Sequence, residues 1–273
     1  MIPAPFAYAR AESLDHAIQL LGEHGDDAKL LAGGHSLLPL MKLRLAIPSL
    51  LVDVGRLSDL SFIREEGDHV TIGALTCHHD VHASELLGRG VPLLRHVAGQ
   101  VGDPQVRHLG TIGGSVAHGD PASDLPAALL ALHATFTARG PAGTREIAVD
   151  EFFTGFLETA LRPDEVLTEI RVPKAPDAGW SFQKFQRRAL DWAIVGVACV
   201  RNGTTGIGLV NLGPTPLRGT AAEAALASGA SIADTAALAD EGTDPPDDLN
   251  ASSGYRRTLA RVLLRRALEE AGR

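Results

Sequence analysis

Cysteine is scarce in this chain of 273 residues, which contains only two, Cys77 and Cys199. An iron–sulfur cluster is usually held by four cysteine thiolates, so this chain does not supply a cluster by itself. The two cysteines also lie too far apart for a CxxC motif. If iron–sulfur chemistry is part of the function, we expect the cluster to lie on a partner chain.

Positive charge is also in the minority, with 25 Lys and Arg against 33 Asp and Glu, a formal net charge of −8. This balance argues against a nucleic-acid or anionic-membrane partner, because phosphate binding needs clustered basic side chains. The longest stretch without a charged residue, Asn202–Leu217, contains glycines and prolines and is a poor candidate for a membrane span. The first ten residues lack the layout of a secretory signal, so we expect a cytoplasmic protein.

Hydrophobic residues are plentiful at 45%, and charged residues make up 21%, which predicts a folded globular protein rather than a disordered one. The length suggests two domains or one large composite domain. Glycine is in excess, since 29 of the 273 residues are glycine, whereas a typical protein has about 7%. Such an excess indicates tight turns or a close approach of the backbone to a ligand.

A first glycine pair lies near the amino terminus, between a predicted strand and a predicted helix. Apolar residues at helical spacing predict a helix over residues 13–24, with Ser13 as its N-cap and Gly25 after its end. A short strand over residues 29–31 then leads into the segment Ala32–Ser36 and a second helix from Leu37 onward. A strand, a Gly-Gly turn and a helix form one candidate phosphate cradle.

A second glycine pair, in Thr111–Ser115, lies within a region of short β-like runs that we expect from Leu50 to about Glu151. It comes after a predicted helix that interrupts these runs and ends near Val101. Another helix is predicted to start at Ser123. Two glycine turns would suit the two phosphates of a dinucleotide, although a Gly-Gly turn is often purely structural. No GxGxxG motif is present, since Asn211 stands where the third glycine of the segment starting at Gly206 would be, so a Rossmann domain is not expected.

The carboxyl-terminal part begins after a predicted linker over residues 172–179, which contains two prolines. Strand-like runs over residues 193–200 and 207–212 are followed by an alanine-rich helical stretch over residues 220–239. A closing helix carries five arginines between residues 256 and 266. We favour a solvated face for these arginines over a subunit contact.

Several single residues allow two interpretations. Ser36 is expected to cap a helix or contact a phosphate, because the closing glycine of a GxSxG nucleophile motif is missing. The segment Cys77–His82 fits an exposed loop better than a metal site, since no zinc spacing matches. Asp124 could cap a helix or accept hydrogen bonds from a cofactor hydroxyl. Trp192 could pack in the core or stack on a planar ligand.

Three strings, Ala32–Ala46, Thr111–Ser115 and Gly119–Pro126, resemble the FAD-binding medium subunits of aerobic carbon monoxide dehydrogenases, in the molybdenum hydroxylase family that includes xanthine dehydrogenase. The resemblance covers essentially the whole chain. It implies an α+β fold with a vanillyl-alcohol oxidase-type (PCMH-type) FAD-binding domain. The implied parts are an amino-terminal α/β lobe (1–55), a mainly antiparallel second lobe (56–175) and a C-terminal α+β domain (176–273).

By this resemblance FAD would lie between the first two lobes, and no side chain would need to act as a general acid or base. The residues that match the family's cofactor contacts are Lys29, Ala32, Gly33, Gly34, His35, Ser36, Val101, Thr111, Ile112, Gly113, Gly114, Ser115, Asp124, Leu167, Lys184 and Trp192. The family commonly has Asn where this chain has Ser115. The carbon monoxide enzyme has Tyr where this chain has Trp192.

The resemblance implies an electron-transfer subunit within a larger complex. A large partner subunit would carry the molybdenum cofactor and the substrate site, and a small subunit would carry two [2Fe–2S] clusters. By the family's pattern, the three subunits would assemble as a dimer of heterotrimers. Electrons would pass from the clusters to FAD and then to an external acceptor. The alternatives are a self-contained flavin oxidoreductase and a scaffold subunit that has lost FAD.

Overall fold

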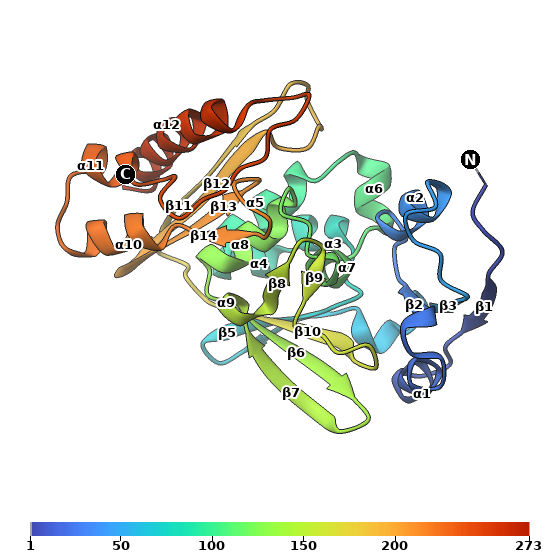
Figure 1. The fold of residues 1–273 in the computed structure, drawn as a ribbon. Coiled ribbons are helices and arrows are strands. Elements are labelled where there is room, and N and C mark those ends of the chain that lie inside the picture. The colour runs from blue at the N-terminus through green and yellow to red at the C-terminus, as the bar shows by residue number, and fades with distance from the viewer. Residues whose placement is uncertain (1, 273) are drawn as a thin grey trace.

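The computed structural model describes residues 2–272, whose strands form four β-sheets. Figure 1 shows a small amino-terminal lobe at one end, a five-stranded sheet with several helices in the middle, and a second helix-covered sheet at the other end. No helix within residues 2–272 has both the length and the apolar composition needed to cross a membrane.

The amino-terminal lobe is a three-stranded parallel sheet. Its strands have the order β1-β3-β2, with bounds β1 (Ala7–Arg10), β2 (Ala28–Leu31) and β3 (Leu50–Asp53). Helix α1 (Leu14–His24) buries Ala17, Ile18 and Leu21, and the Ser13 side chain accepts a hydrogen bond from the N–H of His16 at 3.1 Å. The predicted helix, its N-cap and the strand before the first glycine pair are therefore confirmed. Two short elements complete the lobe, η1 (Gly25–Asp27) and α2 (Leu37–Lys42).

The second lobe has a five-stranded antiparallel sheet of order β4-β5-β10-β6-β7. Its strands are β4 (Ile63–Glu66), β5 (His69–Gly73), β6 (Thr135–Gly140), β7 (Gly143–Ala148) and β10 (Val166–Pro173). The short helix η2 (Ser58–Leu60) precedes them, and α9 (Val149–Phe152), β8 (Phe153–Gly155) and β9 (Glu158–Thr159) form a small excursion before β10.

Six helices lie between β5 and β6, where the sequence predicts two, one ending near Val101 and one starting at Ser123. They are α3 (His78–Ala83), α4 (Glu85–Gly90), α5 (Pro92–Gln100), α6 (Pro104–Leu109), α7 (Ile112–His118) and α8 (Asp124–Ala131). The two predicted helices are α5 and α8, and the other four were missed because none of the six exceeds nine residues. Such lengths are too short for a 3.6-residue apolar period to stand out in the sequence.

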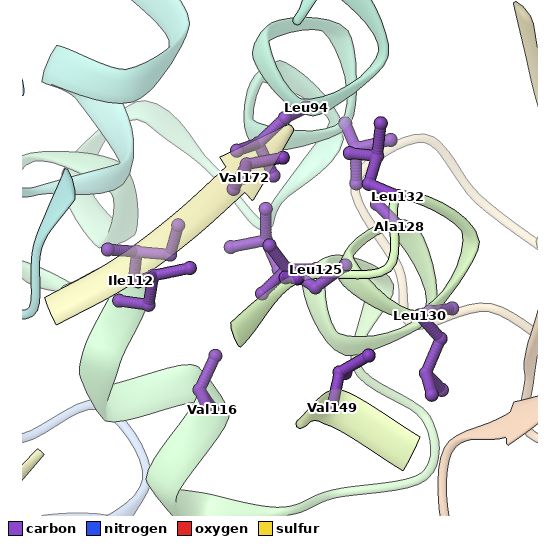
Figure 2. Packing of buried hydrophobic residues seen from close by; sticks show 14 of the residues in the cluster. Leu94, Ile112, Val116, Leu125, Ala128, Leu130, Leu132, Val149 and Val172 are labelled. Carbon is purple, nitrogen blue, oxygen red and sulfur yellow. The ribbon is translucent and has the colours of Figure 1, made fainter. Parts of the chain in front are cut away.

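The main hydrophobic core lies where these helices meet the second sheet. Figure 2 shows Leu94 of α5, Ile112 of α7 and Leu125 of α8 converging on Val172 of β10. Every residue of α8 is buried, because the helix is enclosed between this core and the next sheet. Burial of this kind supplies most of the favourable free energy of folding.

Glycines on the next sheet let α8 approach closely. A Cβ on Gly206 would lie 2.0 Å from the Ala131 carbonyl oxygen, and a Cβ on Gly208 would lie 1.8 Å from that of Ala127. The glycines of the segment that fails as a Rossmann motif therefore serve helix-on-sheet packing.

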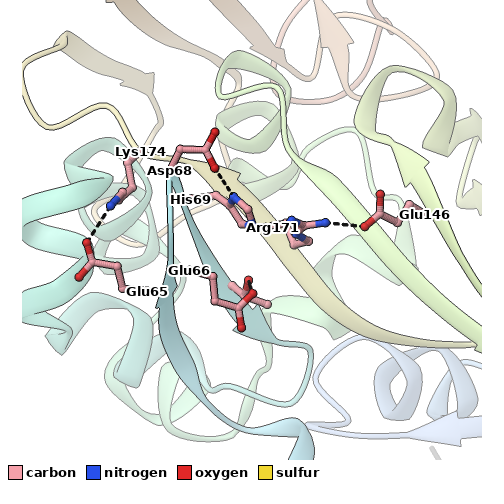
Figure 3. A network of polar contacts seen from close by, with 8 residues as sticks. Glu65, Glu66, Asp68, His69, Glu146, Arg171 and Lys174 are labelled. Atoms are coloured by element: carbon pink, nitrogen blue, oxygen red, sulfur yellow. Dashed lines mark hydrogen bonds and ion pairs between the residues drawn. The ribbon is translucent and has the colours of Figure 1, made fainter.

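The outer face of the second lobe carries ion pairs that reach across an intervening strand of the sheet (Figure 3). Arg171 of β10 pairs with Glu146 of β7 at 2.5 Å, and Lys174 pairs with Glu65 of β4 at 2.7 Å. Pairs as exposed as these contribute at most about 1 kcal/mol each. They mark this face as solvent-facing rather than as part of the core.

The third part is a four-stranded antiparallel sheet covered by helices. Its elements are β11 (Gly179–Phe185), β12 (Val195–Asn202), β13 (Thr204–Val210), β14 (Leu217–Arg218), α10 (Thr220–Ala227), α11 (Ile232–Ala237) and α12 (Ser253–Ala271). The predicted alanine-rich helical stretch is two helices, with Gly229 at a φ of +88° between them.

The predicted solvated face of α12 is confirmed for the exposed Arg261, Arg265 and Arg266, but it is wrong for Arg256. Arg256 is completely buried, and its guanidinium donates to the Ile194 carbonyl oxygen at 2.5 Å and to Asp248 at 2.7 Å. Arg261 pairs with Asp240 at 2.6 Å. Carboxylates from the loop before α12 thus fold back over the helix, a long-range arrangement with no periodic signal in the sequence.

Candidate cofactor-binding site

A cavity of about 290 Å³ lies between the first two lobes. It is bounded by β2, the segment after β2, the start of α7 and the start of β10. Most of the predicted cofactor residues line it, namely Lys29, Ala32, Gly33, Gly34, His35, Ser36, Thr111, Gly113, Gly114, Ser115 and Leu167. The structure thus brings both glycine pairs to one cavity.

The first glycine loop, residues 33–36, leaves its backbone donors free. None of the four N–H groups from Gly33 to Ser36 donates to a protein acceptor within residues 2–272. The Ser36 side chain makes no capping hydrogen bond, so the predicted capping role is wrong and its hydroxyl is available. Gly34 adopts a φ of +74°, a conformation that favours glycine. Consecutive free N–H groups in a loop that lines a cavity are an arrangement that binds anions.

Gly33 is glycine because a side chain here would clash with the backbone before the second glycine segment. A Cβ at this position would lie 2.2 Å from the Leu109 carbonyl oxygen and 2.8 Å from the Gly110 Cα. The first glycine loop therefore touches the backbone that leads into the second glycine segment. This contact, rather than approach of a ligand, excludes a side chain at Gly33.

The second glycine segment, residues 111–115, is not a turn but the beginning of α7, which corrects the prediction. Thr111 is the N-cap, and its Oγ1 accepts from the N–H of Gly114 at 3.1 Å. The N–H groups of Ile112, Gly113 and Ser115 donate to the carbonyl oxygens of Thr76, Ala74 and Thr111, respectively, at 2.8–3.1 Å. All four donors are therefore committed to the protein, and this segment offers the cavity side-chain hydroxyls instead.

His78 is a cavity residue that the sequence did not reveal. The expected exposed loop over Cys77–His82 is instead largely helix α3, and His78 is only 3% exposed. Its Nε2 lies 3.3 Å from Ser115 Oγ, and its Nδ1 has no partner. Burial, with smaller contributions from His35 and Arg107, lowers the pKa of His78 to about 4, so the imidazole is neutral near pH 7. No cluster of three or more potential metal ligands occurs within residues 2–272.

Five predicted residues lie outside the cavity lining, namely Ile112, Val101, Trp192 and the ion pair of Asp124 and Lys184 described below. Ile112 is fully buried in the hydrophobic core, so its side chain is not a cofactor contact (Figure 2). Val101 follows α5 and packs against the same core. Trp192 is 64% exposed and lines a separate hollow of about 830 Å³, which rules out core packing and leaves stacking on a planar ligand as a prediction.

Asp124 and Lys184 form a buried ion pair at 2.7 Å, with side chains 6% and 7% exposed. Ser123, not Asp124, is the N-cap residue of α8, so a capping role for Asp124 is wrong. Burial raises the pKa of Asp124 to about 6 although Lys184 opposes the shift. The Oδ1 atom of Asp124 is buried without a hydrogen-bond partner, whereas Oδ2 accepts from Lys184. A buried carboxylate oxygen in this state fits a hydroxyl donor from a bound molecule.

Two family models together match nearly the whole chain. Residues 4–175 match the family described as FAD binding domain in molybdopterin dehydrogenase, and residues 180–271 match the CO dehydrogenase flavoprotein C-terminal domain. The chain is 42% identical to the carbon monoxide dehydrogenase medium chain of Hydrogenophaga pseudoflava, covering 99% of this chain and 98% of that one. It is 38% identical to the alpha subunit of the 6-hydroxypseudooxynicotine dehydrogenase complex of Paenarthrobacter nicotinovorans, covering 99% and 96%.

A solved structure of carbon monoxide dehydrogenase from Hydrogenophaga pseudoflava superimposes with a TM-score of 0.96 at 44% identity, covering 100% of this chain and 99% of that chain. The predicted fold class is thereby confirmed. The chain belongs to the family of FAD-binding medium subunits of carbon monoxide dehydrogenases and other molybdenum hydroxylases, a family of FAD-dependent oxidoreductases.

Proposed function

We propose that this chain holds FAD in the cavity between its first two lobes and transfers electrons within a molybdenum hydroxylase complex. The observation that carries the proposal is the run of four free N–H groups at residues 33–36, facing a segment that contributes hydroxyls. FAD, when bound, supplies a redox centre that takes up and releases one or two electrons. The chain's own residues bind the cofactor, orient it and limit its contact with water.

Different residues provide the hydrogen-bond donors and the acceptor for FAD. The N–H groups of the first glycine loop and the hydroxyls of Ser36 and Ser115 donate to the pyrophosphate. In the part of the chain that the structure describes, the N–H groups have no acceptor, and the Ser115 hydroxyl contacts only His78. Asp124 Oδ1 accepts from a hydroxyl of the cofactor, while Lys184 holds the other carboxylate oxygen. The remaining predicted contacts, including Val101 and Trp192, stay predictions.

The proposed partner subunits are inferred from the names of related proteins. One relative is named as a medium chain and another as a subunit of a complex. A large subunit with the molybdenum cofactor and a small subunit with two [2Fe–2S] clusters, arranged as a dimer of heterotrimers, would complete an electron path to an external acceptor. The two cysteines of this chain accord with clusters on another subunit. The cytoplasmic location stays a prediction.

The substrate of the complex is not assigned to this chain. Relatives with similar identities, 42% and 38%, are named for different substrates, carbon monoxide and 6-hydroxypseudooxynicotine. Under the proposed scheme the substrate pocket lies on the large subunit, so the residues of this chain do not select the substrate.

Purification of the native complex, followed by a count of flavin, iron and molybdenum per copy of this chain, tests the proposal. We expect one FAD per chain, together with iron and molybdenum on co-purifying subunits. A colourless chain that does not take up added FAD would refute the proposal. Reduction of the flavin by a small organic substrate without partners would instead favour a self-contained oxidoreductase. Full activity of a complex assembled with a cofactor-free variant would favour a scaffold role.

A matched pair of variants tests the location of FAD. Gly114→Val places a side chain on the exposed surface of α7 at the cavity, where only Thr111 Oγ1 lies within 4 Å of the new Cβ. Gly22→Val places the same side chain on α1, where nothing lies within 4 Å. We expect loss of FAD only in the first variant, while both remain folded. Equal FAD content in the two variants would contradict the proposed location.

A further inference from the structure

We propose that His78 is a positioning residue for the Ser115 hydroxyl, holding the oxygen with an Nε2–H donor so that the hydroxyl proton points to an anionic group in the cavity. The inference rests on the proposed function, because the anion would be the pyrophosphate of FAD. It adds a residue that neither the sequence motifs nor the comparisons assign.

The imidazole is fixed in place by the backbone around it. The N–H of His78 donates to the Gly110 carbonyl oxygen at 2.9 Å, and Cys77 forms an isolated antiparallel bridge with Thr111. A Cβ on Gly110 would lie 2.9 Å from the His78 Cδ2 atom and 3.0 Å from Nε2, so glycine is what makes room for the ring. The start of α3 is thereby attached to the start of α7, and the ring edge faces Ser115.

The hydrogen-bond inventory determines which ring nitrogen carries the proton. A neutral imidazole has one N–H donor and one bare nitrogen acceptor. The buried Nδ1 of His78 has no partner, and a buried N–H without an acceptor is rarer in proteins than a buried acceptor without a donor. The proton therefore lies on Nε2, which donates to Ser115 Oγ across 3.3 Å. The Ser115 oxygen then acts as an acceptor toward His78, and its own proton is free for another acceptor.

This arrangement compensates for the committed backbone of α7. The N–H of Ser115 already donates to the Thr111 carbonyl oxygen at 3.1 Å, so it cannot serve an anion fully. An asparagine at this position would carry two amide donors of its own. Serine has only one hydroxyl proton, and a donor that occupies its oxygen keeps that proton directed toward an anion in the cavity. His78 and Ser115 together thus present one oriented donor to the cofactor.

Titration of the cofactor-free chain with FAD, followed by flavin fluorescence, tests the pair. His78→Gln keeps an N–H near the position of Nε2, whereas His78→Asn keeps one only near Nδ1, and His78→Phe keeps none. We expect His78→Gln to bind FAD within about threefold of the wild type. We expect His78→Asn and His78→Phe to bind about tenfold or more weakly, the range for losing a hydrogen bond that serves a charged group. Binding of riboflavin, which lacks phosphate, should change little in any variant.

Double substitutions separate positioning from general damage. Ser115→Ala should weaken FAD binding as much as His78→Phe, and the double variant should be no weaker than either single one. Ser115→Asn should make His78→Phe harmless. Additive losses, or a loss in His78→Phe that Ser115→Asn does not rescue, would overturn the inference.

A spectroscopic measurement without cofactor completes the test. The ¹⁵N chemical shifts of the His78 ring at pH 7 should show a neutral imidazole with the proton on Nε2, and a proton on Nδ1 would overturn the inference even if the variants fail to fold. Wild-type chain that does not bind FAD would refute the proposed function together with this inference. Wild-type chain that binds FAD with an unaffected His78→Phe variant would refute the role of His78 alone.

Discussion

Residues 33–36 and residues 111–115 each place two adjacent glycines before or within the first turn of a helix, and both line one cavity. In the first segment the N–H groups have no protein acceptor among residues 2–272. In the second segment the corresponding N–H groups donate to the carbonyl oxygens of Ala74 and Thr76, just after β5, and to the Thr111 N-cap. The same glycine-rich composition thus yields a donor-rich loop in one lobe and a satisfied helix start in the other.

This difference shows that unsatisfied donors, rather than glycines, identify an anion site. Gly113 is glycine because a Cβ would lie 2.5 Å from both the Cβ and the carbonyl oxygen of Ala74. Gly114 has open space toward the cavity apart from Thr111 Oγ1. Within one Gly-Gly pair, therefore, one glycine serves packing and its neighbour leaves room for a ligand. We therefore expect substitutions at packing glycines to lower stability and substitutions at cavity glycines to lower FAD binding.

The largest effect is expected when a methyl group is placed between the two segments. Gly33→Ala puts a Cβ 2.2 Å from the Leu109 carbonyl oxygen, and a backbone atom cannot move aside cheaply. We expect the free energy of unfolding to fall by about 3 kcal/mol or more, measured by urea denaturation. Gly114→Ala should change it by less than about 1 kcal/mol, because only a side-chain hydroxyl must shift. Similar losses in both variants would mean that the two glycines have the same role.

The second prediction concerns the pH dependence that buried His78 adds at the second glycine segment. Its pKa is about 4 in the folded chain against 6.5 as a free side chain, so the unfolded chain takes up the proton first as the pH falls. Its stabilising contribution is complete above pH 6.5 and is lost toward pH 4, a change of about 3 kcal/mol for 2.5 pKa units. His78→Gln has no such titration, and Asp124 titrates equally in both chains. The difference in unfolding free energy between wild type and His78→Gln should therefore shift by this amount between pH 7.5 and pH 4, and a constant difference would contradict the burial of a neutral ring.

Local patterns predicted much of this molecule because local physics determines those parts. The N-cap Ser13 and the apolar spacing of α1 suffice to define that helix. The glycine loop after β2 follows from a strand, two glycines and a helix close together in sequence. Motif resemblance then identified both segments that line the cavity.

Long-range contacts determined the rest and left no periodic signal. The donors of α7 are satisfied by carbonyl groups near residue 75, about forty positions earlier, which no spacing rule within residues 111–115 could show. His78 became part of the cavity only because α3 folds onto Gly110. Arg256 was mistaken for a surface residue because its partner Asp248 lies on a loop. Each error concerns a polar group whose partner is distant or irregularly spaced.

A smaller effect is expected from backbone strain in the first glycine loop. Gly34→Ala must keep a φ of +74°, which costs a non-glycine residue about 1–2 kcal/mol, and its Cβ would press on the flexible Leu38 side chain at 2.9 Å. Gly67→Ala provides the control, because Gly67 has a φ of +63° with nothing within 4 Å of a Cβ. Both variants should lose similar stability in thermal denaturation. Only Gly34→Ala should also lose FAD affinity in the fluorescence titration, and loss in both would point to strain rather than to the free donors.

The smallest effects on stability, and the sharpest test of the contrast, come from the hydroxyl residues that precede the two helices. Thr111→Ala removes an N-cap hydrogen bond of 3.1 Å to the N–H of Gly114, so we expect unfolding to become easier by about 1 kcal/mol. Ser36→Ala removes no capping bond, so its effect on stability should stay within about 0.5 kcal/mol. FAD affinity should fall more in Ser36→Ala than in Thr111→Ala, because the Ser36 hydroxyl is free to donate to a phosphate. Removing the Thr111 cap releases the Gly114 N–H, and this new donor partly offsets the lost hydroxyl. Equal losses of stability with equal losses of FAD affinity would mean that the two segments do not divide structural and binding roles as their hydrogen bonds indicate.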